Sequence, residues 1–118
     1  NKKLTGAPAV DEILDVEWKS ILGEFTERVN YFCKIMEVTV GRITIRNQKT
    51  RWGSCSSKGN VNFNYQLYYM PRELMDYVII HELSHRRHMN HSAEFWQEVE
   101  KYCKTYRECR KKLRDYEI

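Results

Sequence analysis

Three of the four histidines in this 118-residue sequence stand close together, at His81, His85 and His91. An α-helix turns about 100° per residue, so side chains four positions apart lie on the same face. If residues 81–85 are helical, His81 and His85 present two imidazole rings to one point in space. Neutral imidazole is the commonest metal ligand in proteins. The spacing therefore predicts that this pair holds a metal ion.

The residues before this pair favour a helix, which we expect over residues 71–88. Pro71 suits a first helical turn, and the segment contains no glycine. Leu74 and Val78 fall on the same stripe as the two histidines, and apolar side chains cover the other faces, as in a helix buried between two layers. An unpaired buried polar group costs about 1–3 kcal/mol, so buried imidazoles need partners. A divalent ion satisfies both rings.

Residues 81–85 have the pattern H-E-x-x-H. On a helix, this pattern is typical of zinc enzymes in which the two histidines bind the metal and the glutamate acts on a water molecule at the metal. Glu82 is expected beside the histidine stripe, close to the ion but not bound to it. This position predicts that Glu82 is a general base.

A catalytic zinc ion has three protein ligands and one open position. On a continuous helix His91 would point away from His85, so the chain must turn between them. Asn90 tolerates the left-handed conformation that a turn requires, and Ser92 is a typical N-cap for a following helix. We therefore predict that His91 folds back as the third ligand. The alternative interpretation, surface or core histidines without an ion, does not explain this spacing. It is retained only for His88, which we expect to be exposed and not bound to the metal.

The length allows one domain with a modest core, which we expect over residues 9–118, after a polar tail or linker at residues 1–8. Hydrophobic residues make up 42% and charged residues 31%, as in a globular domain. No secretory leader opens the chain and no apolar run reaches the roughly 20 residues of a membrane span, so no membrane association is expected. The four cysteines form no C-x-x-C pair. We predict reduced thiols in a cytoplasmic protein, with Cys33 and Cys103 in the core.

Hydrophobic periodicity predicts an α+β fold. Apolar residues at three-and-four spacing indicate a long helix over residues 9–37, and a second amphipathic pattern begins near residue 93. Residues 107–114 are expected to form a short final helix or to continue the preceding one. One or two C-terminal helices are therefore expected.

Three short segments between these helices have the alternation of strands: residues 42–46, 50–56 and 60–64. Because tight turns separate them, we predict a three-stranded antiparallel sheet packed on the histidine helix. We expect residues 60–64 to form an edge strand that pairs with an extended peptide substrate.

Several further motifs accompany H-E-x-x-H. They are Arg51-Trp52-Gly53-Ser54-Cys55-Ser56-Ser57-Lys58-Gly59, the asparagine-rich segment that follows, Pro71, the run Tyr77-Val78-Ile79-Ile80, then Asn90-His91-Ser92 and Phe95-Trp96. In this order, over about residues 41–106, they closely resemble the YgjP-like metal-dependent hydrolases.

The resemblance implies a small zincin-like domain, related to SprT-like metallopeptidases, with a three-stranded sheet above the active-site helix. It implies that His81, His85 and His91 bind one Zn²⁺ and that Glu82 is the catalytic acid/base. The spacing from His85 to His91 equals that of metzincins, but their glycine is replaced here by His88. A different kind of turn is therefore expected.

Residues 51–55 can be interpreted in two ways. They could line the substrate cleft, or Trp52 could fill the core while Gly53 permits a bend between strands. The predicted substrate contacts are Arg51, Ser54, Asn62 and Asn64. An oxyanion stabiliser besides the metal is also expected. The candidates are Tyr65, Tyr68, Tyr69, His88 and Arg51.

The sequence favours a zinc-dependent peptidase that acts on peptides or proteins. One alternative is a nucleotide or phosphoanhydride hydrolase, with phosphates held by Arg51, Lys58, Arg86 and Arg87. Another is a nucleic-acid-binding module with structural zinc, which would use the basic residues between 101 and 114. The formal net charge of +4 is mild, and a solvated helix face explains the basic residues more simply.

Overall fold

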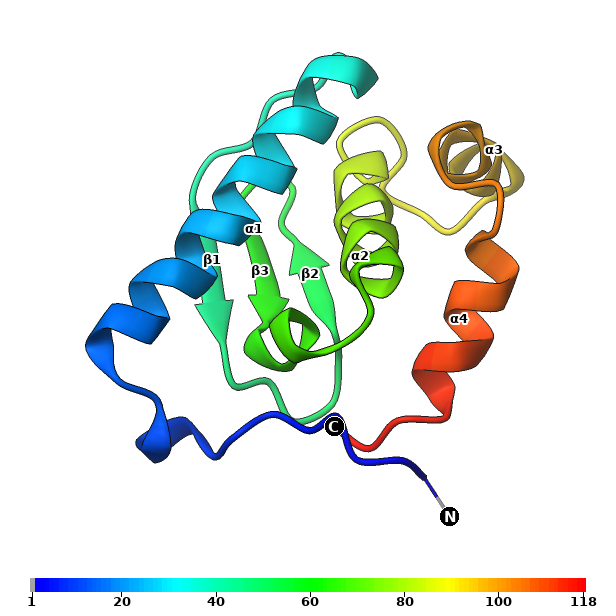
Figure 1. Ribbon diagram of the computed structural model, residues 1–118. Coiled ribbons are helices and arrows are strands. Elements are labelled where there is room, and N and C mark those ends of the chain that lie inside the picture. The colour runs from blue at the N-terminus through cyan, green and yellow to red at the C-terminus, as the bar shows by residue number, and fades with distance from the viewer. Residues whose placement is uncertain (1) are drawn as a thin grey trace.

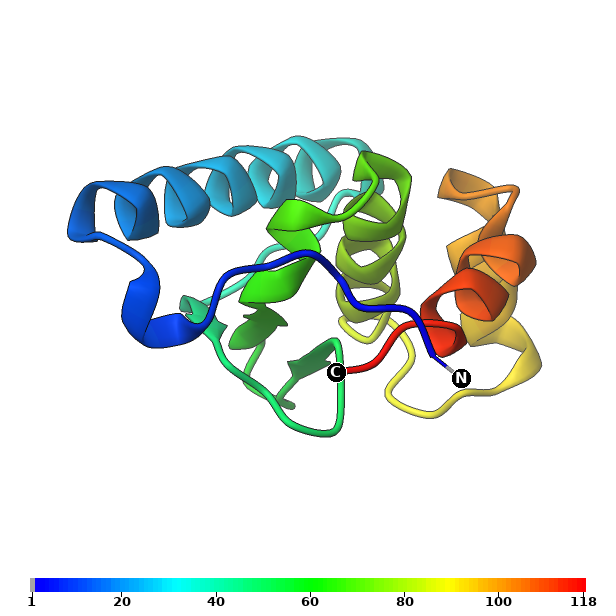
Figure 2. The same cartoon turned by 60° about the horizontal axis from the view of Figure 1, so that its bottom comes forward.

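The computed structural model describes residues 2–118, which form four α-helices and a three-stranded sheet. Helices α1 (Asp15–Met36) and α2 (Arg72–Ser84) lie against the sheet, and α3 (Ala93–Tyr102) and α4 (Tyr106–Arg114) pack on the far side of α2 (Figure 1). In Figure 2, α1 and α2 lie above the strands, on one face of the sheet. The predicted α+β fold is confirmed.

The sheet is mixed, so the prediction of a fully antiparallel sheet is wrong. Strands β1 (Ile43–Arg46), β2 (Gly53–Cys55) and β3 (Val61–Asn64) lie in the order β1-β3-β2. β3 is parallel to β1 and antiparallel to β2. The prediction of residues 60–64 as an edge strand is therefore also wrong, because β3 lies at the centre and β2 at an edge.

The loop between β1 and β2 explains this order. Residues 47–52 carry the chain past the position that β3 later occupies. Asn64, fully buried at the end of β3, donates hydrogen bonds from its amide to the carbonyl oxygens of Gln48 (3.1 Å) and Arg51 (3.3 Å). Because a later residue holds this loop, the local sequence pattern identifies the extended segments but not which of them pair.

Helix α1 covers the sheet with one apolar stripe. Phe25 of this stripe stacks on Phe63 of β3, with ring centroids 5.3 Å apart. The helix begins later than predicted, because residues 10–12 form a short 3₁₀-helix and Leu14, which is 67% exposed, precedes the first turn. The buried side chains of α1 are Ile21, Phe25, Val29, Phe32 and Met36.

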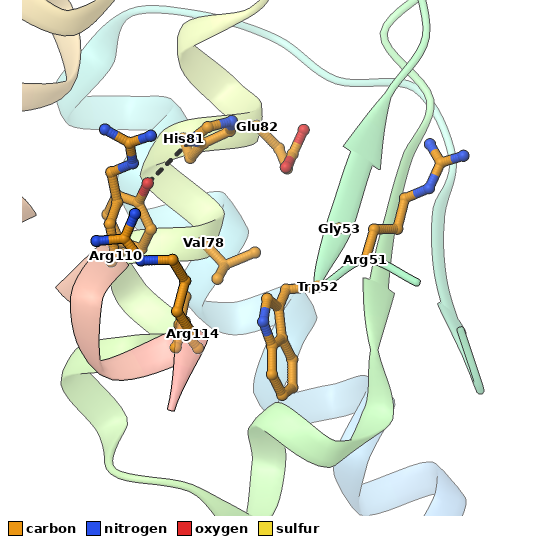
Figure 3. A pocket seen from close by; sticks show the side chains of 10 residues that line it. Arg51, Trp52, Gly53, Val78, His81, Glu82, Arg110 and Arg114 are labelled. Atoms are coloured by element: carbon orange, nitrogen blue, oxygen red, sulfur yellow. Dashed lines mark hydrogen bonds between the residues drawn. The ribbon is translucent and has the colours of Figure 1, made fainter. Parts of the chain in front are cut away.

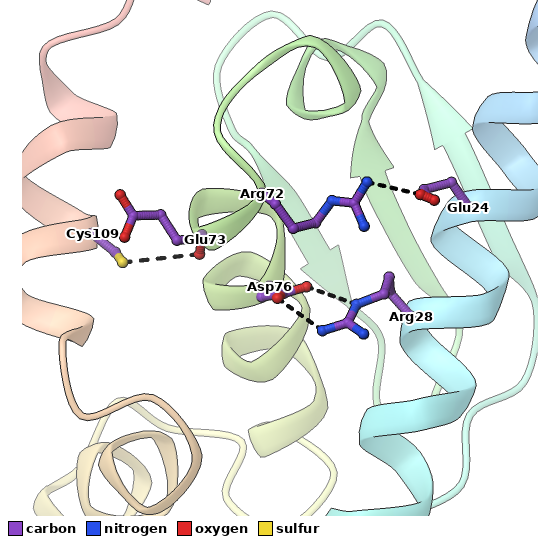
Figure 4. A network of polar contacts seen from close by, with 6 residues as sticks. All are labelled: Glu24, Arg28, Arg72, Glu73, Asp76 and Cys109. Carbon is purple, nitrogen blue, oxygen red and sulfur yellow. Dashed lines mark hydrogen bonds and ion pairs between the residues drawn. The ribbon is translucent and has the colours of Figure 1, made fainter.

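Helix α2 is central, and nine of its 13 residues are buried. Arg28 of α1 donates two hydrogen bonds to the carboxylate of Asp76, at 3.0 and 2.9 Å, and Arg72 pairs with Glu24 of α1 at 2.8 Å (Figure 4). Surface ion pairs contribute little energy each. The bidentate geometry nevertheless fixes how α2 is oriented against α1.

Helices α3 and α4 are separate, since residues 103–105 interrupt the helical backbone. Trp96 of α3 stacks on Tyr106 of α4 with centroids 5.3 Å apart, and Leu113 of α4 is buried. Near the chain ends, Lys3 forms an isolated β-bridge with Tyr116. α4 is therefore attached at both ends, which fixes its position beside α2.

All four cysteines are free. Cys33 and Cys103 are half-buried at the edge of the core, not inside it as predicted, whereas Cys109 is buried. None of the helices formed by residues 2–118 has the length and hydrophobicity of a membrane span.

Candidate metal centre

The end of α2 and the turn after it bring three histidines together. α2 ends at Ser84, and backbone hydrogen bonds from residues 85–88 back to residues 82–84 form a tight turn. Ser92 then caps α3, because its side chain accepts a hydrogen bond from the backbone N–H of Phe95 at 3.3 Å. His91 lies immediately before this cap and points back at α2.

One ring nitrogen from each of His81, His85 and His91 lies within 4.8 Å of the other two. The Nε2 atoms of His81 and His91 are 3.3 Å apart. Tetrahedral ligands that sit about 2.0–2.1 Å from a zinc ion are about 3.3–3.4 Å from each other. The separation of His81 and His91 matches this value, and the three nitrogen donors within 4.8 Å of one another suit a divalent ion such as zinc.

Hydrogen bonds orient two of these rings. Nδ1 of His81 lies 3.1 Å from the hydroxyl of Tyr77, one helical turn earlier, and Nδ1 of His85 lies 3.1 Å from the backbone oxygen of His88. In each ring, Nε2 is thereby left to face the metal position. Metal-binding histidines usually have such a partner on their other nitrogen. Tyr77 was not predicted as a site residue, although its four-residue spacing from His81 places it on the same helical face.

Phe95 forms an apolar support under the three rings. It is fully buried, and its centroid lies 5.0 Å from that of His81, 4.5 Å from that of His85 and 4.9 Å from that of His91. Phe95 therefore restricts ring rotation and keeps water away from one side of the cluster.

Burial also keeps the imidazoles of His81 and His85 neutral, the form that binds metals. It lowers the pKa of His81 to about 3, with further contributions from the neighbouring His85 and His91 and from the charge of Arg110. Burial likewise lowers the pKa of His85. At neutral pH both rings can therefore bind a metal without first releasing a proton.

Glu82 is buried beside the histidines, with 6% of its surface exposed. It points towards β2, where a Cβ atom added to Gly53 would lie 3.2 Å from Glu82 Cγ. Burial raises the pKa of Glu82 to about 8, although the charge of Arg51 opposes this shift. A carboxylate with a pKa near neutrality can both accept and return a proton, as general acid/base catalysis requires.

Two hollows flank His81 and Glu82, and each is lined in part by β2. The arginine pocket, about 290 Å³, is also lined by Trp52, Arg110 and Arg114. Figure 3 shows Arg110 and Arg114 on its α4 side, Trp52 and Gly53 on its β2 side, and residues of α2 between them. The histidine pocket, about 270 Å³, is lined by Ser54, Cys55, Met89 and all three clustered histidines. The two hollows together form a groove along β2.

The structure brings only some of the predicted substrate contacts to this groove. Arg51 lines both hollows and Ser54 lines the histidine pocket. Asn62 lines neither hollow. Its amide nitrogen donates a hydrogen bond to Ser54 Oγ at 3.2 Å, and its amide oxygen accepts one from Arg46 Nε at 3.1 Å. Asn64 is buried and bonded to the loop before β2.

The other predicted polar groups lie elsewhere. Tyr65 donates its hydroxyl hydrogen to the backbone oxygen of Pro8 at 2.7 Å, and Tyr69 donates to Glu17. Arg86 and Arg87, which the alternative nucleotide-hydrolase hypothesis would use to hold phosphates, donate to backbone oxygens at the end of α1 and in the loops near it. Arg110 and Arg114 were missed as groove residues, because their place depends on how α4 packs on α2.

The comparisons with known proteins agree with this geometry. The family model described as YgjP-like, metallopeptidase domain, matches residues 6–116. The metallopeptidase zymogen of Pyrococcus abyssi abylysin is similar in structure, with a TM-score of 0.67 and 25% identity, over 80% of this chain and 99% of that one. The metallopeptidase zymogen of Methanocaldococcus jannaschii jannalysin has a similar fold, with a TM-score of 0.66 and 24% identity, over 75% of this chain and 92% of that one.

No curated protein sequence matches the chain. The family model covers nearly its whole length, including the histidine cluster, Glu82 and both hollows. The fold, the donor set and the matched family together identify a metallopeptidase, and the chain belongs to the YgjP-like metallopeptidase domain family.

Proposed function

We propose that the protein is a zinc-dependent peptidase, in which His81, His85 and His91 hold one Zn²⁺ and Glu82 is the general base. The observation that carries the proposal is the convergence of three imidazoles beside a buried carboxylate in an open groove. When bound, zinc would supply a Lewis acid that polarises a peptide carbonyl and makes a water molecule more acidic.

Glu82 moves the proton in this mechanism. Its carboxylate accepts a proton from the attacking water as the oxygen–carbon bond forms, and it delivers that proton to the amide nitrogen as the carbon–nitrogen bond breaks. A raised pKa makes the carboxylate of Glu82 a stronger proton acceptor than that of an ordinary glutamate. Burial is the main cause of this pKa.

The free edge of β2 is the proposed binding strand for the substrate backbone. β2 pairs with β3 on one side, and among residues 2–118 no strand pairs with its other side. An extended peptide added at this edge would run along the groove between the two hollows. Gly53 favours this arrangement, because the absent side chain leaves room for Glu82.

Arg51 is the proposed oxyanion stabiliser among the predicted candidates, since it lines both hollows and its charge acts on Glu82. The four unpaired cysteines favour a reducing compartment, and we therefore propose a cytoplasmic enzyme. Nucleic-acid binding is less favoured, because Lys101, Arg107 and Lys112 of the basic C-terminal region each pair with a glutamate.

The test is hydrolysis by zinc-loaded protein of a mixed peptide library, read by mass spectrometry, beside the same protein treated with a chelator. Cleavage that needs the metal supports the proposal. A parallel sample measures phosphate release from nucleoside triphosphates. Phosphate release without any peptide cleavage would replace the peptidase with a nucleotide hydrolase.

A further inference from the structure

Two arginines of α4 face the groove and have no role in the proposed chemistry. Arg110, Leu113 and Arg114 are spaced by three and four residues, which places them on one face of the helix. All three line the arginine pocket beside His81 and Glu82. α4 is held in this orientation by the buried Leu113 and by an ion pair of 2.9 Å between Lys112 and Glu73 of α2.

The charges of these two arginines are not neutralised within the described chain. Lys112 and Arg107 of the same helix each have a carboxylate partner, at 2.9 and 3.8 Å. Among residues 2–118, no carboxylate lies within ion-pair distance of Arg110 or Arg114. Like charges four residues apart destabilise a helix. This arrangement is unfavourable for the free protein and favourable for binding an anion.

Arg110 is also held in place. Its guanidinium lies over the ring of Trp96, 4.3 Å from the centroid. A stacked guanidinium loses less side-chain freedom when it binds an anion than a freely moving one. The position of the positive charge is therefore largely set before the ligand arrives.

Part of the arginine pocket is apolar. Trp52, Val78 and Leu113 contribute hydrophobic surface, while Arg51, Tyr77, His81 and Glu82 line the side towards the histidine cluster. The volume of about 290 Å³ accepts a single side chain or chain end. Apolar surface next to two guanidinium groups matches a short aliphatic stem that ends in a carboxylate. In a peptide, such a group is an acidic side chain or the C-terminal residue with its free carboxylate.

We propose that Arg110 and Arg114 bind a carboxylate of the peptide substrate, on the C-terminal side of the bond to be cleaved. This inference rests on the proposed peptidase function. It names the substrate class of that site: peptides with an acidic residue, or a free C-terminus, close to the cleavage point.

The proposed direction is the one that antiparallel pairing with β2 would give. This strand runs from Gly53, which lines both pockets, to Cys55, which lines the histidine pocket but not the arginine pocket. A peptide that pairs antiparallel with β2 runs in the opposite sense, from the histidine pocket to the arginine pocket. Its residues after the scissile bond therefore lie over Arg110 and Arg114.

Binding can be measured without turnover in zinc-loaded Glu82→Gln protein. The probes are three fluorescently labelled hexapeptides of otherwise equal sequence: one with glutamate and an amidated C-terminus, one with glutamine and an amidated C-terminus, and one with glutamine and a free C-terminus. Fluorescence anisotropy gives each affinity. We expect at least one carboxylate peptide to bind about tenfold more tightly than the amidated glutamine peptide, as one charge-assisted hydrogen-bonded pair allows. Which of them does so identifies the source of the carboxylate.

The variants Arg110→Gln and Arg114→Gln, added separately to the Glu82→Gln protein, should each remove most of this preference. Lys111→Gln is the matched control, because it removes the same charge from an exposed position on α4 that does not line the pocket. Thermal melting shows whether each variant remains folded. Having two independent arginine variants keeps the test decisive if one of them unfolds.

Equal affinity for the three peptides would overturn the inference, and so would a preference that both arginine variants retain. These results are separate from the peptidase test. If the zinc-loaded wild-type protein cleaves neutral and acidic peptides equally well, the carboxylate preference fails and the peptidase stands. If the protein binds acidic peptides selectively but cleaves none, carboxylate binding by Arg110 and Arg114 is supported and the proposed peptidase function is rejected.

Discussion

The Nε2 atoms of His81 and His91 lie 3.3 Å apart although the two residues are ten positions apart in the chain. Between these positions α2 ends and the backbone makes a tight turn, and Ser92 then starts α3. The turn is closed by backbone hydrogen bonds and by the contact between His85 Nδ1 and the oxygen of His88. The geometry of the proposed metal centre therefore depends on this corner of the backbone.

Replacing His91 by alanine should abolish stable zinc binding. Loss of a hydrogen-bond partner of a ligand typically weakens metal affinity by about 10–100-fold. Loss of one of the three ligands themselves should weaken zinc affinity by more than about 100-fold. Zinc content after dialysis measures the effect. His88→Ala is the control, because the structure uses only the backbone oxygen of His88 at the site. Equal zinc content in the two variants would show that His91 is not a ligand.

Replacing Tyr77 by phenylalanine should weaken zinc binding without removing it. The variant loses the hydroxyl that orients His81 through Nδ1 at 3.1 Å, and loss of such a partner typically costs about 10–100-fold in metal affinity. Competition with a zinc chelator of known affinity gives the value. Tyr31→Phe is a suitable control, since Tyr31 lies on α1 and is 51% exposed. Unchanged affinity in Tyr77→Phe would exclude this orienting role.

Replacing Gly53 by alanine should disturb Glu82. The new Cβ would lie 3.0 Å from Val78 Cγ1, 3.1 Å from the backbone oxygen of Asn62 and 3.2 Å from Glu82 Cγ. Overpacking of this kind costs about 1–3 kcal/mol of stability, and we expect peptide hydrolysis to fall as well.

Gly23→Ala is the matched control for that variant. An added Cβ at Gly23 has no neighbour within 4 Å, and the residue lies inside α1. Alanine there should stabilise the protein by about 0.5–1 kcal/mol and leave activity unchanged. Urea unfolding of both variants measures the difference, and opposite signs are expected.

The stability of the metal-free protein should depend on pH through Glu82. In the folded state Glu82 keeps its proton up to a pH of about 8, whereas in the unfolded chain it releases the proton near its ordinary pKa of 4.5. The folded state therefore binds more protons between these values, and its stability falls as the pH rises through them.

Urea unfolding in the presence of a chelator tests this dependence at about pH 5 and about pH 8. The wild-type protein should lose stability relative to Glu82→Gln over this interval, on the order of a few kcal/mol. The lowered pKa of His81 has the opposite effect, with stability lost as the pH falls below 6.5, but both proteins share it. Parallel pH curves for the two proteins would contradict the raised pKa of Glu82.

Helix α2 and the candidate site could be predicted because their signals are local. The spacing of His81, Glu82 and His85 defines one helical face, and Ser92 marks the start of the next helix. Apolar residues around α2 indicated its burial. These patterns need no knowledge of the other elements.

The strand order and the arginine pocket could not be predicted because they depend on distant contacts. Asn64 holds the loop before β2 and so places β3 between the other strands. Arg110 and Arg114 reach the groove only because Leu113 packs α4 beside α2. In the sequence, these arginines look like the exposed basic residues around them.

The most direct test of the central claim is a comparison of zinc-loaded wild-type protein with zinc-loaded Glu82→Gln, in which peptide hydrolysis and bound zinc are measured on the same samples. We predict that both proteins retain one zinc ion and that hydrolysis falls about 10²–10⁴-fold in the variant, as expected for the loss of a general base. A Glu82→Gln protein that retains zinc and cleaves peptides at the wild-type rate would contradict the account.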